Sequence, residues 1–400
     1  MNLAIPVNHL LLAIVFHAGS RNDPKGQEGL AHFMEHMPFK GTANFPESKA
    51  LSAFIESHGG KLGAYTGCEK IAFIVRVPRR FADVGIHALN ELTSNALFRK
   101  KDFTKERGVI IGEIVEEEAD AQYFALETLH RYLFRDTPFA HRPLGARGTV
   151  SSMRARDATA FFETHIRCGA FSLFAIGGGN DKRILAKLDR VFGSRHIEKT
   201  PPASPVLFSS AEPEHFLESE QKFATSCTCM GVRVFPPSDQ KRMAALNILS
   251  DMLARDLSSP LYLALREPKR GRGLLYELEF SYVGNSQAGI VSFEAVAEKK
   301  NIPAVRNKFL ETLLFTAADA DRFKVTKTAI VRGFDLAELL LMDIFNHANF
   351  DVFEGGIMPQ TRRQDLQNIN AVTHEDVKDL VRTYLMPEHF SSVNIEGTAI

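Results

Sequence analysis

Residues 29–42 read GLAHFMEHMPFKGT, and the spacing of their side chains predicts a helix with two different sides. Four apolar residues recur at i, i+3, i+4 and i+7: Leu30, Phe33, Met34 and Met37. His32, Glu35 and His36 fall on the other side of the same helix. We therefore expect the apolar side to pack on a core and the polar side to carry two imidazoles and a carboxylate.

This polar side has the chemistry of a zinc site. Imidazoles at i and i+4 are near neighbours on a helix and suit two positions of tetrahedral zinc. The order H-x-x-E-H is the inverted counterpart of the H-E-x-x-H peptidase motif, and a glutamate beside a ligand can act as general base. A solvated helix face can carry the same five residues, so a third ligand has to decide between the two interpretations.

A second predicted helix, FTKERGVIIGEIVEEEADAQ (103–122), supplies candidates for the third ligand. Four acidic residues share one of its faces: Glu106, Glu113, Glu117 and Asp120. The apolar run GVIIGEIV (108–115) predicts that the helix is buried almost all round. A buried carboxylate is costly unless it is paired or binds a metal, whereas a charged outer face is the simpler alternative.

These segments, together with GSRNDP (19–24) and FKGT (39–42), resemble the insulinase/pitrilysin family of zinc peptidases. The resemblance is to the short branch of the family, which includes the mitochondrial processing peptidases. In that family the third ligand is a glutamate at a fixed distance after H-x-x-E-H. Seventy-six residues, 37–112, separate His36 from Glu113, and this is the family spacing.

The resemblance implies a role for each residue of the site. One zinc ion per subunit would be held by His32, His36 and Glu113, and Glu35 would activate a zinc-bound water. Glu106 occupies the place of an important family glutamate, seven residues before the third ligand, and would support the site.

The segment GGKLGAYTGCEKIAF (59–73) resembles the family's edge strand beside the zinc, on which substrate is held as an added β-strand. The resemblance implies substrate contacts from Gly63, Ala64, Tyr65 and Thr66. Gly63 stands where the family usually has asparagine, which removes one polar contact and loosens the strand.

In the second half, SSPLYLALREPKRGRGLLYELEF (258–280) resembles the segment that carries the family's Arg/Tyr pair. The matches are Arg266 and Tyr276, which would bind substrate and polarise the attacked carbonyl. Extra residues within 267–273 widen their usual spacing, and a basic loop beside a core tyrosine is the other interpretation. Since one chain carries both the ligands and this pair, we expect a homodimer; a heterodimer with a related subunit stays open.

The chain divides into two similar halves around a proline-rich segment, EKTPPASPVLFSSAEPE (198–214). We predict a zinc-binding domain at 1–199, a linker at 200–214 and a related domain at 215–400. Each half begins with an apolar strand, a polar turn and an amphipathic helix. We therefore expect an α+β fold of two related domains, each an antiparallel-type sheet with helices packed on one face.

Composition excludes several classes of function. The 48 basic and 48 acidic residues cancel, so no net field attracts nucleic acid, and no apolar run is long enough for a membrane span. The cysteines form no disulfide pattern, and Cys227 and Cys229 fit a buried strand face better than a metal site. We expect a cytoplasmic protein; a periplasmic or organellar location stays open if a targeting segment was removed. Family members usually have a further strand before AIVFHAGS (13–20), so a truncated N-terminus also stays open.

The function implied is that of a zinc-dependent endopeptidase, which hydrolyses unfolded peptides inside a chamber formed between subunits. The alternative is a non-catalytic or partner-dependent subunit of a heterodimeric peptidase or assembly complex, as in the core subunits of the respiratory cytochrome bc complex. The complete motif favours the enzyme. Neither the natural substrate nor the cleavage specificity follows from the sequence.

Overall fold

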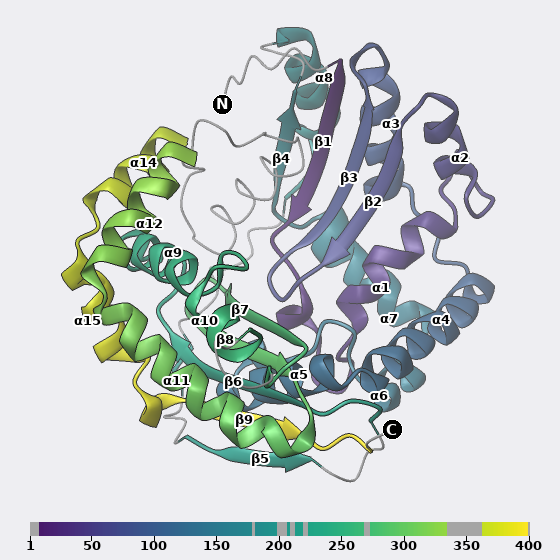
Figure 1. The fold of residues 1–400 in the computed structure, drawn as a ribbon. Helices are drawn as coiled ribbons and strands as arrows, with labels where there is room; N and C mark the ends of the chain where they lie inside the picture. Colours follow the sequence, from purple (N-terminus) through teal and green to yellow (C-terminus); the bar gives the residue numbers. More distant parts are fainter. Residues whose placement is uncertain are drawn as a thin grey trace. The chain divides into compact units, whose positions relative to one another are not determined.

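The fold is α+β, with two separate sheets and many helices (Figure 1). The computed structural model describes residues 8–177, 181–197, 206–208, 213–218, 223–267, 273–333 and 362–398. The described residues form two compact units. Unit 1 takes its residues from Met1–Val115 and His141–Pro205, and unit 2 from Glu116–Ala140, Val206–Glu338 and Phe350–Ile400.

Unit 1 contains a four-stranded antiparallel sheet with the order β2-β3-β1-β4. Its strands are β1 (His9–Phe16), β2 (Lys61–Thr66), β3 (Ile71–Pro78) and β4 (Phe171–Ile176). Figure 1 shows them side by side, with β2 at one edge and β4 at the other. The predicted edge strand is confirmed as β2.

The helices of unit 1 enclose one hydrophobic core with the sheet. They are α1 (Leu30–His36), α2 (Ala50–Ser57), α3 (Ala82–Ser94), α4 (Lys100–Ala119, whose last turn belongs to unit 2), α6 (Arg147–Ser152), α7 (Ala155–Phe161) and α8 (Lys182–Phe192). Short 3-10 turns cover Ser20–Asn22 and Met37–Lys40. The even-numbered residues of β1, such as Leu12 and Ile14, point into this core.

Helix α1 has the two sides that its sequence predicts. All four residues of the apolar stripe are at most 1% exposed, and Phe33 stacks on Phe103 of α4 with ring centroids 4.6 Å apart. This packing fixes α1 against α4, the helix that carries the third candidate ligand.

The burial predicted for α4 is wrong in part. Its buried residues are Phe103, Glu106, Ile110 and Ile114, while Val109 and Val115 are 42% and 43% exposed. The apolar run therefore forms one buried stripe and one solvent-facing stripe, because residues four apart share a helix face. Burial constrains the carboxylate of Glu106, whereas the Glu113 side chain is 36% exposed.

Unit 2 contains a five-stranded sheet with the order β5-β9-β6-β8-β7. Its strands are β5 (His215–Glu218), β6 (Cys227–Val234), β7 (Glu277–Gly284), β8 (Gly289–Val296) and β9 (Ser391–Ile395). The pairing is antiparallel except between β5 and β9, which are parallel. The predicted antiparallel-type sheets are thus present in both units, with one parallel strand added in unit 2.

Helices pack on both faces of this second sheet, so the prediction of helices on one face only is wrong for unit 2. One face holds a core with α9 (Gln240–Ala254), α10 (Pro260–Leu265), α11 (Ile302–Ala318), α12 (Ala320–Gly333), α14 (Arg362–Ala371) and α15 (His374–Tyr384). The other face contacts α5 (Ala121–Leu133), where the Cys227 thiol donates to the Ala121 carbonyl at 3.2 Å. Cys227 and Cys229 are both buried on β6, as predicted.

Most of the predicted linker, 200–214, lies outside the described residues, so the domain limits drawn from the sequence stay a prediction. Residues 116–140, assigned to the first domain by sequence, pack in unit 2. Among the helices that the structure describes, none combines the length and apolarity needed to cross a membrane.

Candidate metal centre

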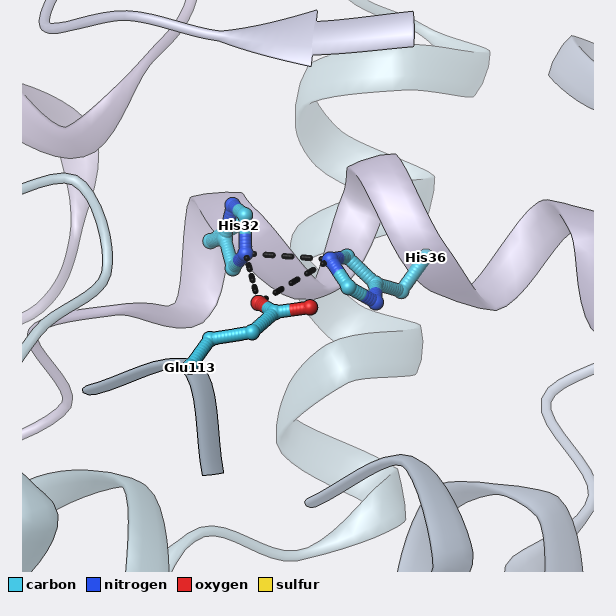
Figure 2. A group of neighbouring side chains, drawn as sticks. All are labelled: His32, His36 and Glu113. Atoms are coloured by element: carbon cyan, nitrogen blue, oxygen red, sulfur yellow. Dashed lines mark hydrogen bonds and ion pairs between the residues drawn. The ribbon is translucent and has the colours of Figure 1, made fainter. Parts of the chain in front are cut away.

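Three side chains from α1 and α4 converge on one point in unit 1 (Figure 2). The Nε2 atoms of His32 and His36 are 3.0 Å apart. The Oε2 atom of Glu113 lies 3.1 Å from the first and 3.6 Å from the second. The structure thus brings together the three residues predicted as ligands.

The donor set and its spacing fit a zinc ion. Two imidazole nitrogens and one carboxylate oxygen are the ligands of one well-known class of catalytic zinc site. Ligand atoms about 2.0–2.1 Å from a tetrahedral metal lie about 3.3 Å from one another. The observed separations of 3.0, 3.1 and 3.6 Å scatter around that value. Only three protein ligands converge among the described residues, which leaves one coordination position for water or substrate.

Glu106 lies behind His36 and fixes the direction of its ring. Its side chain is 2% exposed and its Oε1 accepts a hydrogen bond from His36 Nδ1 at 2.9 Å. With the proton on Nδ1, the lone pair of Nε2 points toward the site. The second oxygen of Glu106 pairs with Lys40 Nζ at 2.8 Å. Burial opposes the charged carboxylate, but the hydrogen bonds from His36 and Lys40 outweigh it and lower the pKa of Glu106.

Glu35 lies one helical turn along from His32 and remains partly open to solvent. Its Oε2 is 3.4 Å from His32 Nδ1, and its side chain is 26% exposed. Burial opposes the charged form of His32, yet hydrogen bonds with Glu35 and Glu113 prevail and raise the pKa of the imidazole. A carboxylate that is both accessible and next to a ligand is suited to exchange protons with a reacting molecule.

The predicted substrate strand β2 lies against α1 at the edge of the sheet. Its inner side pairs with β3 over Lys61–Thr66, and no described strand pairs with its outer side. A Cβ added at Gly63 would meet nothing within 4 Å, so this position has room for a side chain. Among the described residues, Thr66 Oγ1 is buried without a hydrogen-bond partner.

Arg266 and Tyr276 both belong to unit 2. The Arg266 guanidinium lies 5.6 Å from the ring centroid of Tyr262. Tyr276 is 58% exposed, so it is not a core residue, and its hydroxyl lies 3.5 Å from Glu298 Oε1. It lines a pocket of about 670 Å³. Residues 268–272, which hold most of the widened spacing, lie outside the described residues, and the joint role of the pair stays a prediction.

The sequence did not predict a role for two residues near the site. Lys40 holds Glu106 from the 3-10 turn after α1, and Asp23 accepts hydrogen bonds from the backbone of Gly29 and Ala31 at the start of α1. The only signal for either is its membership of a quoted motif, GSRNDP or FKGT. Neither has the spacing of a ligand or of an ordinary helix cap.

Family models match the two halves of the chain in turn. The model described as insulinase, peptidase family M16, matches residues 6–147, and the peptidase M16 inactive domain matches residues 152–329.

Curated relatives include proteins named as proteases or peptidases and a subunit of the cytochrome b-c1 complex. An uncharacterized zinc protease of Rickettsia felis is 25% identical over 289 residues, 72% of this chain and 68% of the relative. The mitochondrial-processing peptidase subunit beta of Caenorhabditis elegans is 30% identical over 202 residues, 50% of this chain but only 44% of that protein. Subunit 1 of the human cytochrome b-c1 complex is 28% identical over 201 residues, 49% of this chain and 42% of that subunit.

Solved structures share the fold over nearly the whole chain. A protease from Helicobacter pylori superimposes with a TM-score of 0.84 at 16% identity, covering 99% of this chain and 95% of the other. A peptidase M16 inactive domain from Pseudomonas fluorescens gives 0.84 at 15% identity, with coverages of 99% and 94%. At these identities the likeness concerns the fold alone.

Proposed function

Because this chain belongs to the insulinase family, peptidase family M16, we propose that it is a zinc-dependent endopeptidase acting on unfolded peptides. The observation that carries the proposal is the convergence of His32, His36 and Glu113, with Glu35 beside them. A subunit without catalytic activity has no need to keep a ligand set together with an accessible carboxylate.

Neighbouring residues hold the predicted ligand side chains in place. Glu106 sets the tautomer of His36, and α1 and α4 are held together by buried aromatic packing. Zinc bound here would polarise the carbonyl group of a peptide bond and lower the pKa of a bound water.

Glu35 would act as the proton carrier of the hydrolysis. It takes one proton from the attacking water as the new carbon–oxygen bond forms, and then donates that proton to the amine nitrogen as the carbon–nitrogen bond breaks. Its partial exposure allows it to reach a molecule at the open side of the site. Arg266 and Tyr276 would donate hydrogen bonds to the carbonyl oxygen while negative charge develops there.

The edge strand β2 supports an extended peptide as the substrate. A peptide added to its outer side would pair through main-chain hydrogen bonds along Gly63, Ala64, Tyr65 and Thr66, which requires an extended and therefore unfolded chain. We propose a homodimer with one zinc per subunit, in which substrate is enclosed between subunits. Main-chain pairing would make chain extension matter more than side-chain identity.

Purified zinc-loaded protein tests the proposal when it is mixed with a library of unstructured peptides. We expect cleavage that a chelator stops and added zinc restores. Glu35→Gln should lower kcat by at least about 100-fold while zinc content stays at one ion per chain, because the variant loses only the proton carrier. Wild-type protein that binds no zinc, or a Glu35→Gln variant as fast as wild type, would disprove it.

The second candidate is a subunit that needs a related partner or serves in assembly, favoured by the similarity to cytochrome b-c1 complex subunit 1. In that case zinc-loaded protein would bind one ion and yet cleave no peptide alone. Activity that appears only after a related subunit is added would support this candidate over the homodimer.

A further inference from the structure

Asp23 is a buried carboxylate outside the predicted ligand set. It is 6% exposed, and both of its oxygens accept hydrogen bonds from the chain at the start of α1. Oδ2 accepts from the Gly29 N–H at 2.7 Å and Oδ1 from the Ala31 N–H at 2.8 Å. The second of these donors belongs to the residue directly before His32.

Helix α1 cannot be capped in the usual way. Its N-cap position is Gly29, with φ of 104°, a backbone conformation that disfavours any side chain. A Cβ at this position would also lie 2.5 Å from the Leu144 carbonyl oxygen. Because residue 29 has to be glycine, no side chain at the N-cap can satisfy the free N–H groups of the first turn. Asp23, six residues earlier, satisfies two of them.

The first turn of α1 matters because it carries a ligand. The helix covers only Leu30–His36, and a helix this short is not stable by itself in water. His32 is its third residue, so disorder in the first turn would displace one of the two imidazoles. Burial raises the pKa of the Asp23 carboxyl to about 7, and the hydrogen bonds from the Gly29 and Ala31 N–H groups oppose that rise.

The other side of Asp23 is anchored to the end of β2. The turn at Ser20–Asn22 places Asp23, whose own N–H donates to the Ser20 carbonyl at 3.1 Å. Backbone N–H groups of Ser20 and Arg21 donate to the carbonyls of Gly67 and Cys68 at 3.1 and 3.0 Å, just after β2 ends. An ion pair between Arg21 and Glu69 joins the same two loops.

We propose that Asp23 is a positioning residue of the metal centre, which holds the first turn of α1, and with it His32, in a fixed place relative to strand β2. The inference rests on the proposed function, since the metal centre and the substrate strand have to be held in register for hydrolysis. Asp23 itself touches neither metal nor substrate.

The arrangement requires a carboxylate at position 23. Asparagine has the same shape but only one acceptor oxygen, so its NH₂ group would face one of the two N–H donors. Alanine would leave both buried N–H groups without a partner. Glycine at position 29 cannot compensate, because it has no side chain.

Zinc affinity of the purified, zinc-free protein, measured by competition with a chromogenic chelator, tests the inference. We expect Asp23→Asn and Asp23→Ala to bind zinc about five- to tenfold more weakly than wild type, the factor that loss of one helix cap represents. Hydrogen exchange in zinc-free Asp23→Asn should also be faster at the Gly29 and Ala31 amides.

A matched control is Asp181→Asn. Asp181 caps α8 in the same unit by accepting from the Arg183 N–H at 3.0 Å, and α8 carries no predicted ligand. This variant should keep the zinc affinity of wild type. Melting curves of the zinc-free proteins identify any variant that fails to fold, and the isosteric Asp23→Asn keeps the test valid if Asp23→Ala does not fold.

Each outcome has one meaning. Folded Asp23→Asn with wild-type zinc affinity would overturn the inference, even if its amides exchange faster, because Asp23 would then stabilise the helix without positioning a ligand. Equal weakening in Asp181→Asn would also overturn it. Wild-type protein without zinc affinity would instead disprove the proposed function.

Discussion

At the scale of single residues, the candidate metal centre consists of an inner set of three predicted ligands and an outer pair of residues that supports one of them. His32, His36 and Glu113 meet at distances of 3.0–3.6 Å. Glu106 contacts His36 and Lys40 contacts Glu106, so this pair lies outside the set of predicted ligands. A buried carboxylate such as that of Glu106 needs a cation or hydrogen-bond donor on each oxygen. The outer pair should therefore affect how well the metal is held.

Lys40 provides a test of this outer support. Lys40→Met removes the ammonium partner of Glu106 while keeping the length of the side chain, which leaves one carboxylate oxygen buried without its cation. We expect zinc affinity about tenfold weaker than wild type, since Glu106 would then hold His36 less firmly. Chelator competition on zinc-free protein measures the change. Lys100→Met, at an exposed position that begins α4, is the control and should bind zinc like wild type.

At the scale of elements, β2 has an outer edge that no described strand pairs with, and it contains a glycine, Gly63, that lowers the stability of the strand. Glycine lowers the stability of a strand because it loses more conformational freedom on folding than other residues. Gly63 lies in the middle of β2, opposite Ile74 of β3, and has open space where a side chain would stand. The strand thus tolerates a larger residue.

Gly63→Asn should strengthen the substrate strand. The amide fits the open space and offers a peptide one further hydrogen bond, so we expect KM to fall about three- to tenfold with kcat nearly unchanged. Initial rates on one peptide from the cleaved library provide both constants. Lys61→Asn, also on β2, controls for a general effect of asparagine in this strand. A KM that rises or stays constant in Gly63→Asn would contradict the prediction.

Strand β8 contains a carboxyl group that makes stability depend on pH. Glu294 is 8% exposed and pairs across the sheet with Glu279; burial, and then the neighbouring carboxylate, raise its pKa from 4.5 to about 7. The folded state therefore favours the neutral form. Relative to the ionised form, the neutral Glu294 side chain stabilises the folded state. This contribution is fully present below about pH 4.5 and is lost as the pH rises through about 7.

Glu294→Gln should remove that dependence. At pH 8 the variant should unfold with a free energy about 1–3 kcal/mol larger than wild type, and the difference should shrink toward pH 4.5. Urea denaturation at a series of pH values measures it. Glu277→Gln, at an exposed position on β7, should follow wild type. If the difference in unfolding free energy between Glu294→Gln and wild type did not change with pH, the raised pKa of Glu294 could not be its cause.

At the scale of the whole molecule, the predicted ligands belong to unit 1 and the predicted Arg/Tyr pair to unit 2. Each unit has its own sheet and its own core. The proposed hydrolysis would require both parts at one peptide bond. In a homodimer the Arg/Tyr pair could come from the same chain or from its partner, and these two arrangements have different consequences for mixed dimers.

Mixing two inactive variants distinguishes the arrangements. Glu35→Gln and Tyr276→Phe are unfolded together, refolded and assayed on the same peptide. If Tyr276 acts on the partner's metal centre, mixed dimers contain one site with both native groups, and activity should return to about a quarter of wild type. If each chain is complete by itself, the mixture should stay as inactive as either variant. No restored activity would refute the shared site.

The sequence by itself determined much of the candidate site and the fold class. The i, i+4 histidines and the apolar stripe follow from periodicity along the chain. Glu113 is one of four acidic residues on one face of its predicted helix, and only the resemblance to the family spacing after His36 selects it. The α+β class follows from local strand and helix patterns, whereas the edge strand β2 is predicted from the family resemblance of residues 59–73.

Only the tertiary structure decided which side chains depend on one another. The fold brings Lys40 to Glu106 and Asp23 to the start of α1 from different elements. It also leaves Val109 and Val115 of α4 facing solvent. No local spacing encodes these contacts, because hydrogen bonding and burial depend on which surfaces meet. The parallel pairing of β5 with β9 and the packing of α5 in unit 2 could not be predicted for the same reason. Both depend on contacts between residues that lie far apart in the sequence.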